Sequence, residues 1–83
     1  MKINNEKLWF KTTDLAMATT LYTLNVPLEA IERSIHTRKV SFVFSKQNND
    51  LEQILQQYWK KEIRIEPQVY FQNLRLLKNR IYS

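Results

Sequence analysis

The side chains that could carry acid–base, nucleophilic or metal chemistry are few in this chain and lie scattered along it. The sequence contains one histidine, His36, and neither cysteine nor glycine. A metal site or catalytic centre needs several groups at suitable spacing, and neither His36 nor the 8 Asp and Glu residues form such a set. Phosphate-binding loops and the nucleophile elbow depend on glycine, so both are excluded. We therefore expect a protein that is not an enzyme, with no catalytic residues, no metal and no cofactor.

Basic side chains are the next candidates for function. The chain carries 13 Lys and Arg against 8 Asp and Glu, a net charge of +5, which attracts anions such as nucleic acids and nucleotides. Some of these cations are clustered: two are adjacent in a predicted turn, and two others stand three positions apart on a predicted helix. The residues expected to bind an anionic ligand are Lys11, Arg38, Lys39, Arg75 and Lys78. The alternative for these clusters is an ordinary solvated polar face.

Two tryptophans are candidates for contact with a partner protein. Trp9 shares one strand face with Lys11, and Trp59 follows Tyr58, so that their side chains point about 100° apart around a helix. The chain therefore has more aromatic side chains than one side of a small sheet can bury. Trp9 and Trp59 could bind a host protein or a second copy of the chain in a homodimer. The alternative is that a helix covers Trp9 and that the second and third helices pack on each other.

The elements that must position these residues follow from hydrophobic periodicity, beginning with a strand over Leu8–Thr12. A helix follows, with Thr13 as its N-cap and Asp14 facing the positive end of the helix dipole. Asn25 and Pro27 predict the end of this helix, with Asn25 in the left-handed conformation usually taken by glycine.

The segment over residues 28–36 is ambiguous between strand and helix. Alternation at Ile31, Arg33 and Ile35 favours a strand, and the polar residues 36–39 then form the turn of a hairpin. The second strand of that hairpin is Val40–Ser45, whose residues alternate with period two.

The final third predicts two amphipathic helices. One follows a loop over residues 46–49, is capped by Asn48 or Asn49, and runs from Asp50 to about Lys61. A short fourth strand over residues 62–65 is possible, and Pro67 suits the first turn of the last helix. The apolar residues at helical spacing are Leu51, Ile54, Leu55, Tyr58 and Trp59 in the first of these helices, and Tyr70, Leu74, Leu77 and Ile81 in the second.

These elements predict one small α+β domain over residues 1–83, in which a small antiparallel sheet packs against helices. The order is β-α-β-β-α-(β)-α, which is ferredoxin-like with a C-terminal helix when the bracketed strand forms. The sequence has no apolar run of the roughly 20 residues that a membrane helix needs, and no segment resembling a signal peptide. We expect a cytoplasmic protein without a membrane partner.

Three motifs in order carry a resemblance to a known family. They are Phe10–Leu15, with an aromatic residue before Thr and Asp-Leu; the Val40–Phe44 strand; and Pro67–Tyr82, with its Leu-Arg and Leu-Lys pairs. Together they resemble a small bacterial and phage family catalogued only as a domain of unknown function. The resemblance implies an association with phages and mobile elements, and it brings no activity, cofactor or catalytic residue.

One function hypothesis and one alternative follow. The hypothesis is a non-enzymatic binding module of phage or mobile-element type that binds nucleic acid or a nucleotide signal through basic residues. The alternative is a protein-binding inhibitor or adaptor that acts through exposed aromatic residues, with self-assembly as a further role.

Overall fold

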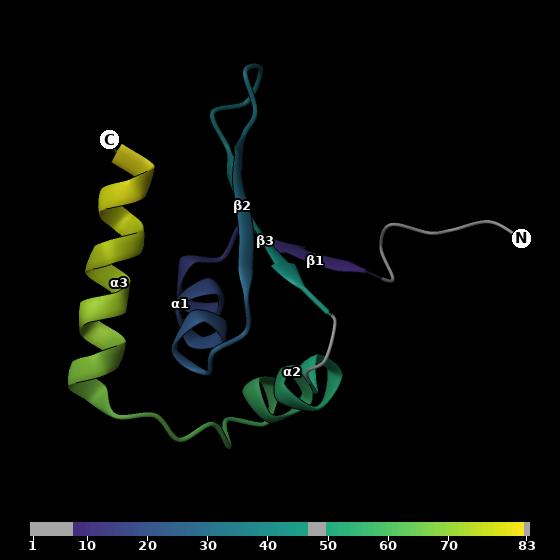
Figure 1. Ribbon diagram of the computed structural model, residues 1–83, viewed down its shortest axis with the longest axis vertical. Coiled ribbons are helices and arrows are strands. Elements are labelled where there is room, and N and C mark those ends of the chain that lie inside the picture. The colour runs from purple at the N-terminus through teal and green to yellow at the C-terminus, as the bar shows by residue number, and fades with distance from the viewer. Residues whose placement is uncertain (1–7, 47–49, 83) are drawn as a thin grey trace, which may run out of the picture.

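The computed structural model describes residues 8–46 and 50–82, and it has the α+β class and the element order predicted from the sequence (Figure 1). Residues 28–33, which the sequence left open between strand and helix, form a strand. The elements are β1 (Trp9–Thr12), α1 (Leu15–Thr23), β2 (Leu28–Arg33), β3 (Val40–Ser45), α2 (Leu51–Trp59) and α3 (Pro67–Tyr82).

The three strands form one antiparallel sheet in the order β1-β3-β2. β3 is antiparallel to both neighbours, with Phe44 opposite Phe10 on one side and Phe42 opposite Ile31 on the other. β1 and β2 therefore run parallel to each other, with α1 connecting them. The β2–β3 ladder is irregular between Leu28 and Ala30. This arrangement corresponds to the opening β-α-β-β part of the ferredoxin-like order.

The core lies between the sheet and α1. Phe42 and Phe44 are fully buried and point to the side on which α1 contributes Ala18 and Leu21. Leu77 of α3 is buried in this cluster and Ile81 packs against it, and these side chains attach the last helix to the core.

Both ends of α1 are set by local hydrogen bonds. Asp14 Oδ1 accepts from the backbone N–H of Ala16 at 2.9 Å and of Met17 at 3.2 Å, so Asp14 is the N-cap. The prediction of Thr13 in that role is wrong by one residue, because the carboxylate and not the hydroxyl accepts these bonds. At the other end Asn25 has a φ of 67°, which confirms its left-handed conformation.

The connection from α2 to α3 is not a strand. The fourth strand predicted as possible over residues 62–65 does not form, although Ile63 and Ile65 are partly buried. Lys61, with a φ of 61°, turns the chain at the end of α2, and the segment crosses to the start of α3 instead of joining the sheet (Figure 1). The predicted caps Asn48 and Asn49 lie outside the described residues, and Asp50 precedes α2 without a side-chain capping bond.

α3 packs along α1 at the edge of the molecule (Figure 1). Glu66 Oε1 accepts from the backbone N–H of Val69 at 2.8 Å, and Pro67 occupies the first helical position as predicted. Asn73 Nδ2 donates to Thr23 Oγ1 at 2.9 Å and joins the two helices. None of the helices within residues 8–46 and 50–82 combines the length and apolar character that a membrane span requires.

Candidate functional site

The β2–β3 hairpin projects beyond the rest of the sheet and carries two of the predicted cations (Figure 1). Ser34 Oγ accepts from the backbone N–H groups of His36 and Thr37, both at 3.2 Å. Arg38 is left-handed, with a φ of 62°, and Ser34 N–H donates to the Lys39 carbonyl at 3.0 Å. This compact turn leaves Arg38 and Lys39 exposed at the tip of the hairpin.

Arg33 joins the base of this hairpin to the end of α3. Its Nη2 donates to the carbonyl of Arg80 at 3.1 Å and to the carbonyl of Ile81. Carbonyls in the last turn of a helix carry partial negative charge, so a guanidinium there is favourable. The contact holds the hairpin and the C-terminal half of α3 side by side.

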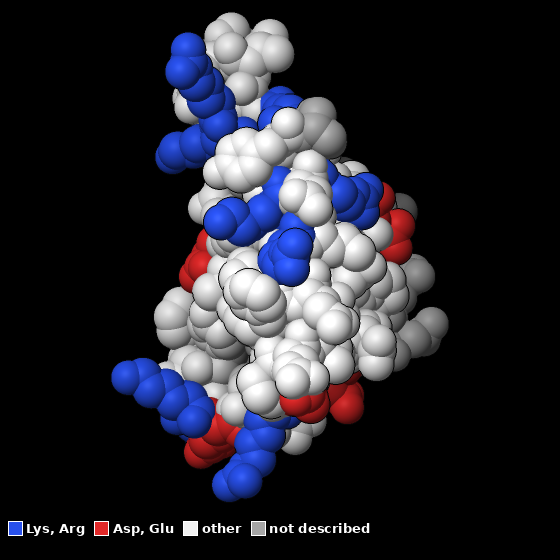
Figure 2. Space-filling model, turned by 90° about the vertical axis from the view of Figure 1, so that its left-hand side faces the viewer, with Lys and Arg blue, Asp and Glu red and all other residues white. Residues whose placement is uncertain are grey.

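The remaining predicted cations are exposed on α3. Arg75 lies near the ring of Phe71, with its Cζ 5.9 Å from the ring centroid, and Lys78 stands one turn further along. We define the basic face as the cations of the hairpin and of α3: Arg33, Arg38, Lys39, Arg75, Lys78 and Arg80. Figure 2 shows Lys and Arg side chains gathered over the part of this side that the hairpin and the end of α3 occupy.

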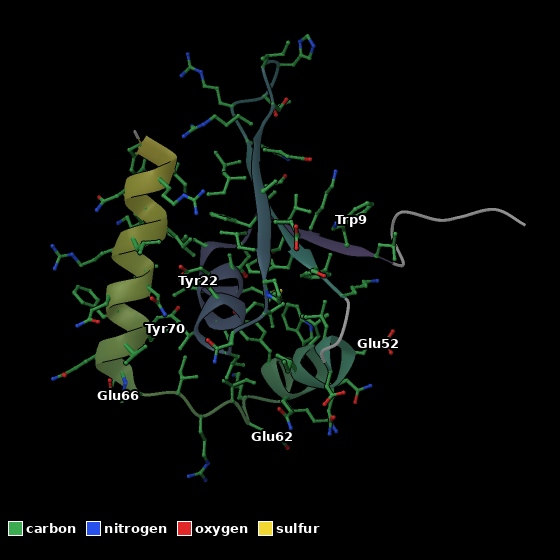
Figure 3. The ribbon with its side chains drawn as sticks, in the orientation of Figure 1. Trp9, Tyr22, Glu52, Glu62, Glu66 and Tyr70 are labelled. Atoms are coloured by element: carbon green, nitrogen blue, oxygen red, sulfur yellow. The ribbon has the colours of Figure 1, made fainter. Side chains whose placement is uncertain are left out.

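The two segments that supply the basic face contain no acidic side chain. None of the 8 Asp and Glu residues lies within residues 33–46 or 67–83, the two segments that supply the face. Figure 3 shows Glu66 at the start of α3 and Glu62 below α2, both at the end of the molecule away from the hairpin. Separation of the two signs gives a positive field on this side of the molecule, which the modest net charge alone would not reveal.

The structure brings four of the five predicted anion-binding residues to this face and separates the fifth. Lys11 lies on the sheet face opposite α1, where its Nζ is 3.1 Å from Glu32 Oε1. Arg33 and Arg80, which are not among the five predicted residues, complete the face. The absence of acidic residues from both segments was the signal that could have identified them.

The two predicted partner-binding tryptophans are both solvent-accessible. Trp9, on β1, is 38% exposed and lies on the sheet face opposite α1, far from α3 (Figure 3). Trp59, at the end of α2, is 69% exposed and meets the Tyr58 ring edge-on at 5.3 Å between centroids. The alternative in which the second and third helices pack on each other is wrong, because α3 packs chiefly on α1.

An apolar hollow of about 570 Å³ lies where α1, the end of α2 and the start of α3 meet. Burial raises the pKa of the Tyr58 phenol in this hollow, and the nearby Asp14 carboxylate and Tyr70 raise it further. In residues 8–46 and 50–82 no three His, Asp or Glu side chains come together as a metal site would require. The residues that line the hollow are Ala16, Thr20, Tyr58, Lys61, Ile63, Ile65, Pro67, Tyr70 and Phe71.

Comparison with known proteins gives a family and no function. No curated protein matches the chain, and no solved structure does. A family model described as a domain of unknown function, DUF5659, matches residues 7–83. The bacterial and phage origin expected from the sequence stays a prediction. The match covers more than half of the chain, and the protein therefore belongs to the DUF5659 family.

Proposed function

We propose that this protein is a non-enzymatic module that binds nucleic acid through the basic face. The observation that supports the proposal is the separation of charge: six cations lie on two segments that are distant in sequence and joined in space by Arg33, and these segments contain no acidic residue. Phosphate groups are the anions that such a surface attracts most strongly.

The shape of the face favours a polymer over a single nucleotide. Its cations are spread along the hairpin and a helix of 16 residues, which is about 24 Å long. A nucleotide site instead needs a concave pocket with convergent polar groups. The apolar hollow is concave, but Lys61 is the one cation among the residues that line it.

The test measures binding of a fluorescent nucleic acid of random sequence at low salt by anisotropy. Arg38→Ala with Lys39→Ala removes one arginine and one lysine from the hairpin. Lys60→Ala with Arg64→Ala removes the same pair of residue types from exposed positions at the opposite end of the molecule. A charge-assisted contact contributes roughly 1.5 kcal/mol, which corresponds to about a tenfold change in affinity.

The hairpin double variant should therefore bind at least about tenfold more weakly, and the control should lose much less. Equal losses in the two variants would mean that only net charge matters and that the basic face is a solvated surface. Absence of binding to DNA and RNA at low salt would refute the proposal.

A protein-binding role is the second candidate, and the exposure of Trp59 favours it. Large exposed aromatics often serve as anchors in interfaces. Binding through Trp59 or Trp9 would be nearly insensitive to salt, because apolar burial is not screened. Co-purification after nuclease treatment, compared between the native chain and Trp59→Ala, tests this role. The homodimer, the host-protein partner and the cytoplasmic location stay predictions.

A further inference from the structure

The outward side of α3 carries a stripe of long polar side chains. Tyr70, Leu74, Leu77 and Ile81 face the rest of the protein, and each has a polar residue two positions before it, about 200° around the helix. All four polar residues are exposed: Gln68, Gln72, Arg75 and Asn79.

The residue types in this stripe are those that read base pairs. Arginine makes paired hydrogen bonds with guanine, and asparagine or glutamine makes them with adenine, on the major-groove edges of the bases. An ordinary solvated helix face instead mixes acidic and basic residues, whereas α3 contains neither Asp nor Glu.

We propose that α3 enters the major groove of duplex DNA and that Gln72, Arg75 and Asn79 contact the base edges; this inference rests on the proposed function of the basic face. A helix with its side chains is about 10–12 Å across, and the major groove of B-form DNA is about 12 Å wide. The same groove in duplex RNA is too narrow for side chains to read, so the partner is DNA.

The surroundings of the stripe suit this docking. α3 lies at the edge of the molecule (Figure 1), and its stripe is on the side of the helix away from the buried Leu77. A hollow of about 430 Å³ lies among Gln72, Arg75, Leu76, Asn79 and Arg80, so these side chains leave room beside them. Phe71 is 56% exposed and its ring lies against Arg75, which restricts the guanidinium without neutralising its charge.

With α3 in the major groove, the β2–β3 hairpin lies beside the groove. Because Arg33 holds the hairpin base against the last turn of α3, the helix and the hairpin tip meet the DNA as one surface. Arg38 and Lys39 at the tip are placed to contact phosphates along the groove edge. Phosphate contacts fix the register of the protein, and the stripe on α3 selects the sequence.

The experiment selects binding sites for the purified protein from a library of random duplex DNA. The selected duplex and a scrambled duplex are then titrated with the native chain, Gln72→Ala and Asn79→Ala, with Gln56→Ala as control. Gln56 is an exposed glutamine on α2, and none of these changes alters the charge. Melting curves of each variant check that the fold is retained.

The selection should yield a preferred sequence. The ratio of affinities for the selected and scrambled duplexes should fall about 5- to 150-fold for Gln72→Ala and for Asn79→Ala, and stay unchanged for Gln56→Ala. Purines that lack the major-groove ring nitrogen should reduce the ratio in the same way.

Two results would overturn the inference while leaving the proposed function intact. One is salt-dependent DNA binding with no preferred sequence, or with a preference that both substitutions leave unchanged. The other is tighter binding to single strands or to RNA than to any selected duplex. Absence of binding to every nucleic acid would overturn the inference and the proposed function together.

Discussion

Lys61 is a lysine in a backbone conformation that glycine adopts at lower cost, and replacing it should stabilise the protein. Its φ is 61°, its N–H donates to the Tyr58 carbonyl at 3.1 Å, and the N–H of Glu62 donates to the Gln57 carbonyl at 2.9 Å. These two bonds form a Schellman motif, in which the left-handed position is most often glycine.

The expected gain in the free energy of unfolding is the difference between two opposing contributions. A side chain in the left-handed region costs roughly 1–2 kcal/mol. Glycine adds flexibility to the unfolded chain, which costs about 0.4–1 kcal/mol. Lys61→Gly should therefore raise the free energy of unfolding by roughly 0.5–1 kcal/mol, which is about 2–8 °C in Tm for a domain of this size.

Lys60 provides the matched control. It is also an exposed lysine, but its φ is −84°, so Lys60→Gly brings the flexibility cost without relief of strain. Thermal melting by circular dichroism and urea denaturation should show opposite signs for the two variants. If both variants destabilise the protein to a similar extent, the left-handed turn at Lys61 is wrong.

Three further predictions concern the core, the helix caps and pH. Leu77→Ala should lower the free energy of unfolding by roughly 2–5 kcal/mol in urea denaturation, and Leu76→Ala, at a side chain 40% exposed, by much less; similar losses would contradict the packing of α3. Asp14→Ala should cost roughly 0.5–2 kcal/mol in thermal melting, whereas Asp50→Ala should cost little, because the Asp50 side chain makes no capping bond; the reverse order would contradict the assigned caps. The raised pKa of Tyr58 means that the unfolded chain loses this proton first, so stability should fall as the pH rises above about 10; Tyr58→Phe should reduce that fall, and an unchanged pH profile would contradict the burial of the phenol.

The elements that the sequence predicts correctly are those whose local pattern and tertiary environment agree. Val40–Ser45 alternates, and Phe42 and Phe44 face the core as that alternation requires. Asn25 and Pro67 act through their own backbone preferences, so their roles could be predicted without knowledge of the fold.

Where the local sequence pattern does not decide between strand and another structure, the outcome depends on pairing with strands that are distant in the chain. Residues 31–35 and 62–65 both alternate in sequence, but β2, which holds residues 28–33, pairs with β3, whereas residues 62–65 pair with no strand in the part of the chain that the structure describes. A strand needs a partner for its backbone hydrogen bonds, and the sequence of the segment alone does not supply that information.

The assembly of the basic face also depends on contacts between residues that are distant in the chain. Arg38 with Lys39 and Arg75 with Lys78 were recognisable as local clusters, but their meeting in space depends on the contact of Arg33 with α3. Lys11 belongs to no such cluster, and its pairing with Glu32 follows from the register of three strands.

The salt dependence of DNA binding by the native chain shows whether the basic face contacts phosphates. Each phosphate contact releases counterions, so the logarithm of the association constant should fall linearly with the logarithm of salt concentration. If Arg75 contacts a base edge and the other five cations of the basic face contact phosphates, the slope should approach about −4.5, and a steep slope of several units is expected. A slope near zero, or no saturable binding at low salt, would mean that the basic face does not bind DNA through phosphate contacts.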